Sequence, residues 1–218
     1  MPSPKKIILK QFQNGPMDNF QYFIGDAATG EVAIVDPAWD VDLIRSLAEQ
    51  NGYKIVNIFL THGHPDHING LGRLLATHDI PVYISKYEAP FLMPKCKNLN
   101  MVEKDEVLSV GGVKFETYRT PGHTPGCICF KHGDILIAGD AIFIDGCGRC
   151  DLPGGDAVLM YDSLYNVISK FPDSTLIFPG HDYGPKPYDT LGNQKKTNPY
   201  LTCSSREEFL RHRMGLIF

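Results

Sequence analysis

The sequence predicts an α/β protein in which two mixed β-sheets pack face to face with helices outside, a four-layer αβ/βα sandwich. Short apolar runs bounded by turn residues are followed by stretches of helical spacing, and this order occurs twice along the chain. The composition agrees with a globular protein, since 43% of the residues are hydrophobic and 21% are charged. We expect the 218 residues to form a single domain over residues 1–218.

The first half of the chain opens with three apolar runs, and the turn residues between them predict a β-meander. These runs are residues 7–12, 20–24 and 32–35. Asp40 has the side chain of a helix N-cap, and the helix that it begins is expected to end at Asn51. The continuous apolar run 55–60 is typical of a strand buried on both faces. A helix near residues 71–75 and a strand at 81–84 complete this half.

The second half repeats the same style. Its predicted strands are residues 113–118, 127–130 and 135–138. Apolar residues fall at helical spacing over residues 161–171, and a further strand is expected at 175–178. A short helix is expected at 206–213.

Charge and hydropathy exclude several classes of protein. Lys and Arg number 21 against 25 Asp and Glu, a net charge of −4, whereas nucleic-acid binders usually carry a basic surplus. No apolar run approaches the roughly 20 residues that span a bilayer. The apolar stretch near the N-terminus is too short for a signal peptide, so we expect a cytoplasmic protein. The six cysteines are therefore expected to remain free thiols.

The most informative segment is residues 61–67, which directly follows the predicted strand 55–60. It holds three imidazoles and one carboxylate, namely His62, His64, Asp66 and His67. Neutral imidazole and carboxylate are preferred ligands of zinc and similar ions. Gly63 and Pro65 favour a sharply bent loop rather than a helix. In such a loop, His62 and His64 can face one ion while Asp66 and His67 face a neighbouring one.

Three further ligand candidates follow predicted strands, and each comes directly after a glycine. They are His123, Asp140 and His181. A lone histidine in a loop is more often structural than metal-binding, but this clustering indicates a metal site. The set contains no cysteine, unlike most structural zinc sites, and seven ligands are too many for one tetrahedral ion. The sequence therefore predicts two ions with open coordination positions, which is typical of catalysis.

The ligand pattern, in its chain order from His62 to His181, resembles the metallo-β-lactamase superfamily and most of all its glyoxalase II branch. The resemblance covers nearly the whole chain and implies the same αβ/βα sandwich. It implies a first ion bound by His62, His64 and His123, a second bound by Asp66, His67 and His181, and Asp140 as the bridge between them. Asp36 matches an acidic position that supports the ligands in such proteins, or else it is a turn residue before Pro37.

The resemblance implies hydrolysis of a small-molecule thioester such as a hydroxyacylglutathione. The cofactors would be two divalent ions, Zn, Fe or Mn, which lower the pKa of a shared water. Asp66 would orient that water as well as bind metal. Arg149 matches a position that meets glutathione in relatives, and it suits a carboxylate. Tyr183 and Lys186 are further candidates for lining the substrate pocket.

The main alternative is a persulfide dioxygenase, which shares the fold and a Gly-Cys-Gly-Arg stretch like residues 146–149. Such an enzyme uses one iron, and His62, His123 and Asp140 form a suitable set of two imidazoles and one carboxylate. The complete second ligand set favours the hydrolase. A nuclease or a β-lactamase is less favoured, because there is neither a basic surplus nor an export signal. Cys147 and Cys150 form a CxxC pair, either redox-active or simply two unpaired thiols.

Overall fold

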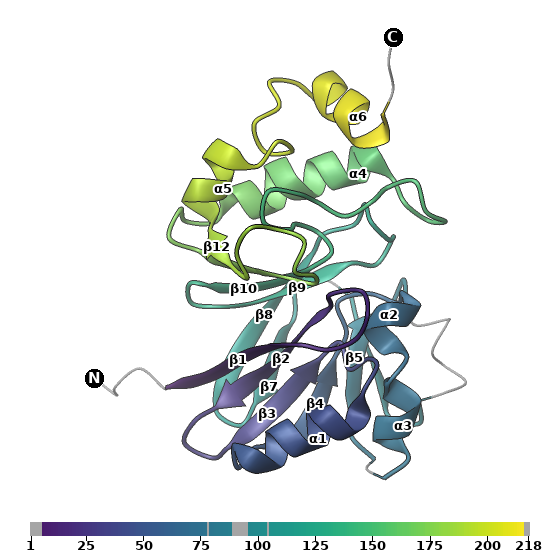
Figure 1. The fold of residues 1–218 in the computed structure, drawn as a ribbon, viewed down its shortest axis with the longest axis vertical. Coiled ribbons are helices and arrows are strands. Elements are labelled where there is room, and N and C mark those ends of the chain that lie inside the picture. The colour runs from purple at the N-terminus through teal and green to yellow at the C-terminus, as the bar shows by residue number, and fades with distance from the viewer. Residues whose placement is uncertain (1–5, 78, 89–95, 104, 216–218) are drawn as a thin grey trace. The chain divides into compact units, whose positions relative to one another are not determined.

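The computed structural model describes residues 6–77, 79–88, 96–103 and 105–215 (Figure 1). The first five residues, on which the expected localisation partly depends, lie outside the described part. The chain forms two compact units, Met1–Glu116 and Thr117–Phe218, which are described in turn. No described helix combines the length and the apolar character needed to cross a membrane.

The first unit contains a six-stranded mixed sheet whose strands follow one another in chain order. They are β1 (Ile7–Gln13), β2 (Phe20–Asp26), β3 (Glu31–Val35), β4 (Lys54–Phe59), β5 (Val82–Ser85) and β6 (Leu99–Val102). The first three strands are antiparallel, as a meander requires, and β3 to β6 run parallel. Parallel neighbours need crossover connections. Helix α1 (Val41–Gln50) supplies one, and α2 (Pro65–Ile68) with α3 (Leu71–Leu75) supplies the next.

Helix α1 begins where the sequence predicts. The Asp40 carboxylate accepts hydrogen bonds from the backbone N–H groups of Asp42 and Leu43, which would otherwise have no partner in the helix. Val41, Ile44 and Ala48 share one face and are buried in the same core cluster as the strands of the first sheet. Figure 1 shows α1 lying along this sheet, with α3 beside it. Burial of each large apolar side chain contributes about 1.5–3 kcal/mol.

The second sheet also has six strands, in the order β12-β11-β10-β9-β8-β7. They are β7 (Val107–Val110), β8 (Val113–Arg119), β9 (Ile128–His132), β10 (Ile135–Gly139), β11 (Leu176–Pro179) and β12 (Asp189–Thr190). Strands β10 and β11 are parallel, whereas β9–β10, β11–β12 and β7–β8 are antiparallel, so this sheet is mixed as well. The boundary between the two units falls within β8.

The β7–β8 hairpin packs within the first unit. The Asn57 side chain of β4 donates a hydrogen bond of 2.9 Å to the Ser109 carbonyl of β7. The Phe59 and Phe115 rings meet edge to face, with centroids 6.1 Å apart. Phe59 is the last residue of β4, so this contact anchors the strand just before the predicted ligand segment.

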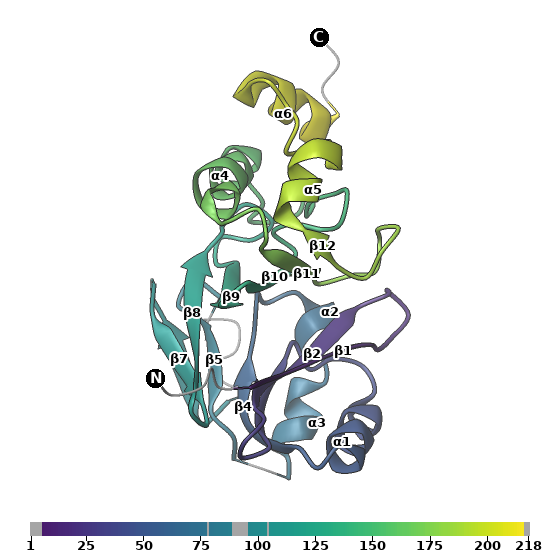
Figure 2. The same ribbon diagram turned by 90° about the vertical axis from the view of Figure 1, so that its left-hand side faces the viewer.

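In the second unit, three helical segments follow one another without a break. These are α4 (Ala157–Asp162), the π-helix η2 (Ser163–Val167) and the 3₁₀ turn η3 (Ile168–Lys170). Asp156 caps the first segment, and Leu164 and Ile168 are fully buried. Helices α5 (Leu191–Thr197) and α6 (Arg206–Met214) come later in the chain. Figures 1 and 2 both place α4 and α5 on the same side of β10.

The predicted elements are largely confirmed, with instructive exceptions. The helix expected over residues 161–171 begins earlier, at Ala157, because Asp156 caps it. The strand expected at 127–130 is displaced to Ile128–His132. Five elements were not predicted, namely α2, β6, β7, β12 and α5. Three of these are strands of two or four residues, too short to give a periodic signal.

Candidate functional site

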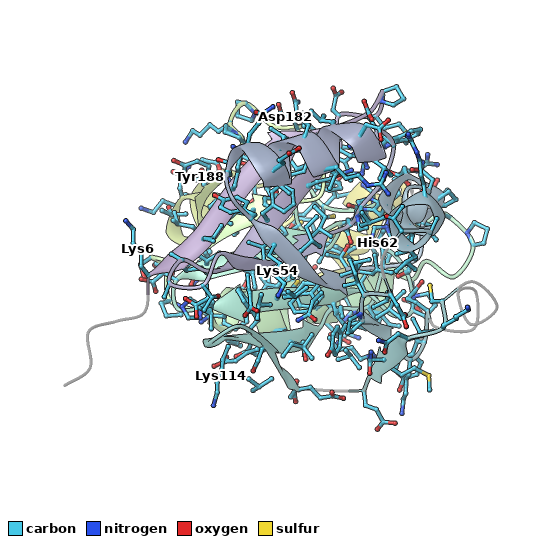
Figure 3. All side chains as sticks on the ribbon, turned by 90° about the horizontal axis from the view of Figure 1, so that it is seen from below. Lys6, Lys54, His62, Lys114, Asp182 and Tyr188 are labelled. Atoms are coloured by element: carbon cyan, nitrogen blue, oxygen red, sulfur yellow. The ribbon has the colours of Figure 1, made fainter. Side chains whose placement is uncertain are left out.

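The first group of predicted ligands lies at the C-terminal end of β4, in the first unit. His62, labelled in Figure 3, and His67 are buried, whereas His64 and Asp66 are partly exposed. The expectation of a bent loop throughout this segment was wrong, because α2 begins at Pro65. A proline fits this first helical position because its missing N–H would have no partner there.

The side chains of this group meet in two pairs. The His62 Nε2 and His64 Nδ1 atoms are 3.1 Å apart, and the His67 Nε2 and Asp66 Oδ2 atoms are 3.4 Å apart. Ligand atoms that bind a tetrahedral zinc ion at about 2.0–2.1 Å lie roughly 3.3 Å from each other. Both pairs therefore have the spacing of donors that share a metal ion.

Asp36 holds two of these imidazoles from behind. Its carboxylate accepts hydrogen bonds from His67 Nδ1 (3.0 Å), from the Thr61 hydroxyl (2.6 Å) and from the Thr61 backbone N–H (2.7 Å). Since the Thr61 hydroxyl donates to Asp36, its oxygen accepts from His62 Nδ1, at 3.0 Å. Both rings thus carry their proton on Nδ1 and present Nε2 as the candidate ligand atom. Asp36 therefore supports two of the predicted ligands through hydrogen bonds and is more than a turn residue before proline.

The second group of predicted ligands lies in the second unit, on three separate loops. His123 is in the loop between β8 and β9, Asp140 directly follows β10, and His181 comes shortly after β11. All three side chains are buried. The Asp140 Oδ2 atom is 3.3 Å from His123 Nε2 and 3.5 Å from His181 Nε2. This central carboxylate, flanked by two imidazoles, is again suited to a divalent ion.

The orientation of His123 depends on main-chain groups. Its Nδ1 donates a 2.7 Å hydrogen bond to the Arg149 carbonyl, which leaves Nε2 as the candidate ligand atom. The Ser163 hydroxyl at the start of η2 donates to the Pro121 carbonyl (2.6 Å), and the Asp156 N–H donates to the Gly122 carbonyl (2.8 Å). The helical segment thus supports the His123 loop from behind.

Gly148 allows the loop before Arg149 to approach the ligands. A Cβ atom at this position would lie 2.1 Å from the Asp140 carbonyl oxygen and 2.9 Å from the His123 Cβ. The Gly-Cys-Gly-Arg stretch therefore has a packing reason for its second glycine. This contact could not be inferred from local sequence, because residues 123, 140 and 148 meet only in the folded chain.

The three predicted substrate contacts differ in how they are held. The exposed Arg149 guanidinium forms two hydrogen bonds with the Asp151 carboxylate, of 3.0 and 2.7 Å. The pairing raises the pKa of Arg149 and lowers the pKa of Asp151 to about 2. Tyr183 is 55% exposed, and its ring stacks on His181 with centroids 4.5 Å apart. The Lys186 Nζ atom lies 3.4 Å from Asp189 Oδ1. Substrate binding by Arg149, Tyr183 and Lys186 stays a prediction.

The CxxC thiols have the properties of core residues. Cys147 and Cys150 are 5% and 3% exposed and belong to the core cluster of the second unit. Burial raises the pKa of both thiols, that of Cys150 to about 11. Because the thiolate is the reactive form, these cysteines are poor nucleophiles near neutral pH.

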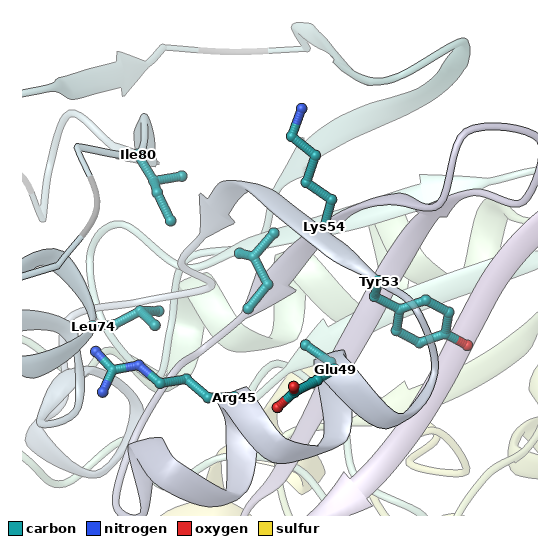
Figure 4. Close-up of a pocket in the computed structure, with 8 residues that line it drawn as sticks. Arg45, Glu49, Tyr53, Lys54, Leu74 and Ile80 are labelled. Carbon is teal, nitrogen blue, oxygen red and sulfur yellow. The ribbon is translucent and has the colours of Figure 1, made fainter.

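A separate hollow of about 460 Å³ lies in the first unit, over helix α1 and the start of β4 (Figure 4). An apolar floor that includes Ala48, Ile55 and Ile80 is flanked by the charged side chains of Arg45 and Lys54. Its β4 residues come from the N-terminal end of the strand, whereas the ligand group follows the C-terminal end. The hollow is therefore distinct from the ligand group of the first unit.

Comparison with known families matches residues 14–181 to the metallo-beta-lactamase superfamily. The "Probable polyketide biosynthesis zinc-dependent hydrolase BaeB" of Bacillus velezensis is 32% identical over 195 residues, which cover 89% of this chain and 87% of that protein. The mitochondrial persulfide dioxygenase ETHE1 of Homo sapiens is 32% identical over 94% of this chain and 80% of its own length. The hydroxyacylglutathione hydrolase of Pseudomonas syringae is 34% identical over 76% of this chain and 62% of its own length.

Solved structures give the same family likeness. The crystal structure of ETHE1 from Myxococcus xanthus is 33% identical, with a TM-score of 0.86 and coverage of 96% of this chain and 92% of that chain. TTHA1623 in a di-iron-bound form is 28% identical, with a TM-score of 0.78 and coverage of 88% and 100%. The predicted metallo-β-lactamase fold is confirmed.

Proposed function

We infer that this chain, which belongs to the metallo-β-lactamase superfamily, is a metal-dependent hydrolase that cleaves a small-molecule thioester of the hydroxyacylglutathione type. The main support for the proposal is the spacing of the candidate ligand atoms and the hydrogen bonds that orient the imidazole rings. Imidazole and carboxylate atoms lie 3.1–3.5 Å apart within each ligand group. His62, His67 and His123 each donate from Nδ1 to a protein oxygen. Fixing the second ring nitrogen in this way is typical of metal-binding histidines.

We assign all seven predicted ligands to divalent ions, which would lower the pKa of bound water and polarise a carbonyl. The residues of the chain supply the rest. Asp36 keeps His62 and His67 in the tautomer with Nε2 as the ligand atom. Asp66 is assigned both as a ligand and as the acceptor that orients the attacking water. Burial of most of these groups limits competition from bulk water.

Substrate recognition is assigned to the exposed side chains of the second unit. Arg149 offers a planar guanidinium that can bind a carboxylate through two hydrogen bonds, as it binds Asp151 here. A substrate carboxylate would exchange with Asp151 at little cost, because water screens the attraction between exposed ion-pair partners. We assign Tyr183, whose ring stacks on His181, to cover an acyl or thiol group of the substrate.

A persulfide dioxygenase is the second candidate. The likeness to persulfide dioxygenase ETHE1 extends over 94% of this chain, further than the likeness to the hydroxyacylglutathione hydrolase. One iron bound by two imidazoles and one carboxylate is enough for that reaction. The hydrolase is favoured because Asp66 and His67, which a single-iron site does not need, have the spacing of ligands and are supported by their own hydrogen bonds.

The test is a paired assay on one preparation of the protein. After elemental analysis, metal-free protein is reloaded with zinc or with iron. Each form is then given a hydroxyacylglutathione thioester and, separately, glutathione persulfide with dissolved oxygen. We expect metal-dependent release of glutathione from the thioester. Oxygen consumption with the persulfide and no thioester cleavage would establish the dioxygenase instead, and no turnover of either substrate would refute both assignments.

A further inference from the structure

Asn19 contacts the predicted ligand Asp66 at two points. Its Nδ2 donates a 3.0 Å hydrogen bond to the Asp66 carboxylate Oδ2 and a 3.2 Å hydrogen bond to the Asp66 backbone carbonyl. Asn19 is only 1% exposed and directly precedes β2, 47 residues earlier in the chain. One amide therefore fixes the side chain of Asp66 relative to its own main chain, and so limits rotation of the carboxylate.

The orientation of this amide is set by Trp39. The indole Nε1 donates a 2.8 Å hydrogen bond to Asn19 Oδ1. An indole N–H can only donate, so Asn19 must turn its oxygen toward Trp39 and its NH₂ group toward Asp66. A flipped amide would place two donors against each other at the indole and two acceptors against each other at Asp66. Trp39 thus makes Asn19 an obligatory donor to the carboxylate.

Trp39 is itself held in an unusual conformation. Its φ of 61° is in the left-handed region, which is a strained conformation for a bulky residue. Its backbone N–H donates to the side chain of Asn69, the residue that follows α2. The indole also lies against Gly15, where a Cβ atom would come within 2.2 Å of the ring. Trp39 is therefore linked to helix α2 at two points. Its backbone N–H bonds to Asn69, which follows the C-terminal end of α2, and its indole is linked through Asn19 to Asp66 within α2.

We propose that Asn19, oriented by Trp39, is a positioning residue that sets the direction of the Asp66 carboxylate for metal binding. The inference rests on the role of Asp66 as a ligand in the proposed function. It has a spectroscopic consequence, because Trp39 is the only tryptophan of the sequence. An ion that draws charge from Asp66 changes the hydrogen bonds of the Asp66–Asn19–Trp39 chain, since bonded groups polarise one another. Trp39 emission therefore reports metal binding.

The test measures zinc affinity and tryptophan emission on metal-free protein. Zinc is titrated against a chromophoric chelator, and Trp39 emission is followed in parallel. For Asn19→Ala we expect roughly 10–100-fold weaker zinc binding at the affected ion, as for other residues that orient ligands. Asn19→Asp is expected to lose more, because it sets a carboxylate against Asp66. The emission change on zinc binding, present in the unaltered protein, is expected to be lost in both variants.

Two further variants keep the test decisive. Trp39→Phe keeps an aromatic side chain, smaller than the indole, but removes the N–H, so it tests the amide orientation without changing Asn19, and weaker zinc binding is expected. Asn57→Ala removes another buried amide of the same unit, one that donates to Ser109, and zinc affinity should stay within about twofold. A purely structural role of Asn19 would lower thermal stability and leave zinc affinity unchanged.

The outcomes separate the two proposals. If the unaltered protein binds zinc and the variants of Asn19 and Trp39 bind it equally well, the positioning role is refuted and the proposed function stands. If the unaltered protein binds neither zinc nor iron, the proposed function fails, and the inference about Asn19 fails with it.

Discussion

The two ligand groups differ in how the chain builds and supports them. In the first unit, four predicted ligands lie within six consecutive residues, His62 to His67. Their support comes from side chains, namely Asp36, Thr61 and Asn19. In the second unit, the three predicted ligands lie on separate loops, and His123 is oriented by a main-chain carbonyl.

This difference determines which supporting hydrogen bonds a point substitution can remove. Side-chain hydrogen bonds in the first unit can be removed one at a time by substitution. The hydrogen bond from His123 to the Arg149 carbonyl survives any change of the Arg149 side chain, and can be disturbed only by moving the loop. We therefore expect that single side-chain substitutions can weaken metal binding by the first group in small steps. Metal binding by the second group should change mainly when backbone packing changes.

Removal of a ligand from either group is expected to have the largest effect. His64→Ala and Asp140→Ala should each lower turnover by roughly 10³-fold or more, because metal ions supply several kcal/mol of transition-state stabilisation. Metal content, measured by elemental analysis, should fall in parallel. His212→Ala, which changes an exposed histidine on α6, serves as the matched control. Full activity after either ligand change would contradict the assignment of that group.

Asp36→Asn should have an intermediate effect, confined to the first group. The substitution removes the charge that holds His67 and Thr61, and we expect roughly 10–100-fold weaker metal binding. The φ of 51° at this residue is one that asparagine tolerates, so the backbone should be preserved. Titration of the metal-free protein with zinc measures the effect. Asp36→Ala should bind metal as weakly and also unfold at a lower temperature. Unchanged zinc affinity in Asp36→Asn would show that Asp36 does not support the ligands.

A pair of neighbouring substitutions tests main-chain support in the second group. Gly148→Ala would force a Cβ atom against the Asp140 carbonyl, and overpacking of this kind costs about 1–3 kcal/mol. Its denaturation midpoint and its metal content should both fall. Arg149→Ala should leave the denaturation midpoint nearly unchanged, because the side chain is exposed and the carbonyl remains. A raised KM with unchanged metal content in Arg149→Ala would support substrate contact. A loss of metal would contradict main-chain support.

The smallest effect concerns pH and falls on the second unit, which holds five of the six cysteines. Burial raises the pKa of Cys129 to about 12 and that of Cys150 to about 11, against an ordinary value of 9.0. The unfolded chain therefore releases these protons at lower pH than the folded chain. The resulting stabilisation is complete below pH 9.0 and is lost as pH rises toward 11. Denaturant unfolding at increasing alkaline pH measures this loss, and a midpoint that stays constant would contradict it.

Most of the fold could be predicted from the sequence because its main elements have local signals, such as caps and apolar runs. Helix α1 has a capping aspartate and a clear apolar face, and β4 is a continuous apolar run. Helix α2 was missed because proline suggested a turn, although proline suits the first position of a helix. Strands β6 and β12 owe their existence to neighbouring strands rather than to their own short sequences.

The same contrast holds for the candidate site. The four clustered residues of the first unit were predicted as ligands from their spacing, and the three scattered ones from their places after strands, and their metal binding stays a prediction. Asn19 and Trp39 could not, because they are separated from Asp66 by 47 and 27 positions and carry no motif of their own. Supporting residues of this kind are defined by the folded chain, and only a structure brings them together.

The π-helix η2 determines whether the chain can lose a residue in this segment. A π turn holds one residue more than an α turn, and each residue turns an α-helix by about 100°. The extra residue lets Ser163 reach the Pro121 carbonyl while Ile168 still enters the core. A chain shortened by one residue here could keep the Ser163–Pro121 hydrogen bond that supports the His123 loop, or keep Ile168 in the core, but not both. Natural deletions should therefore avoid this stretch, even though it lies outside the ligand loops.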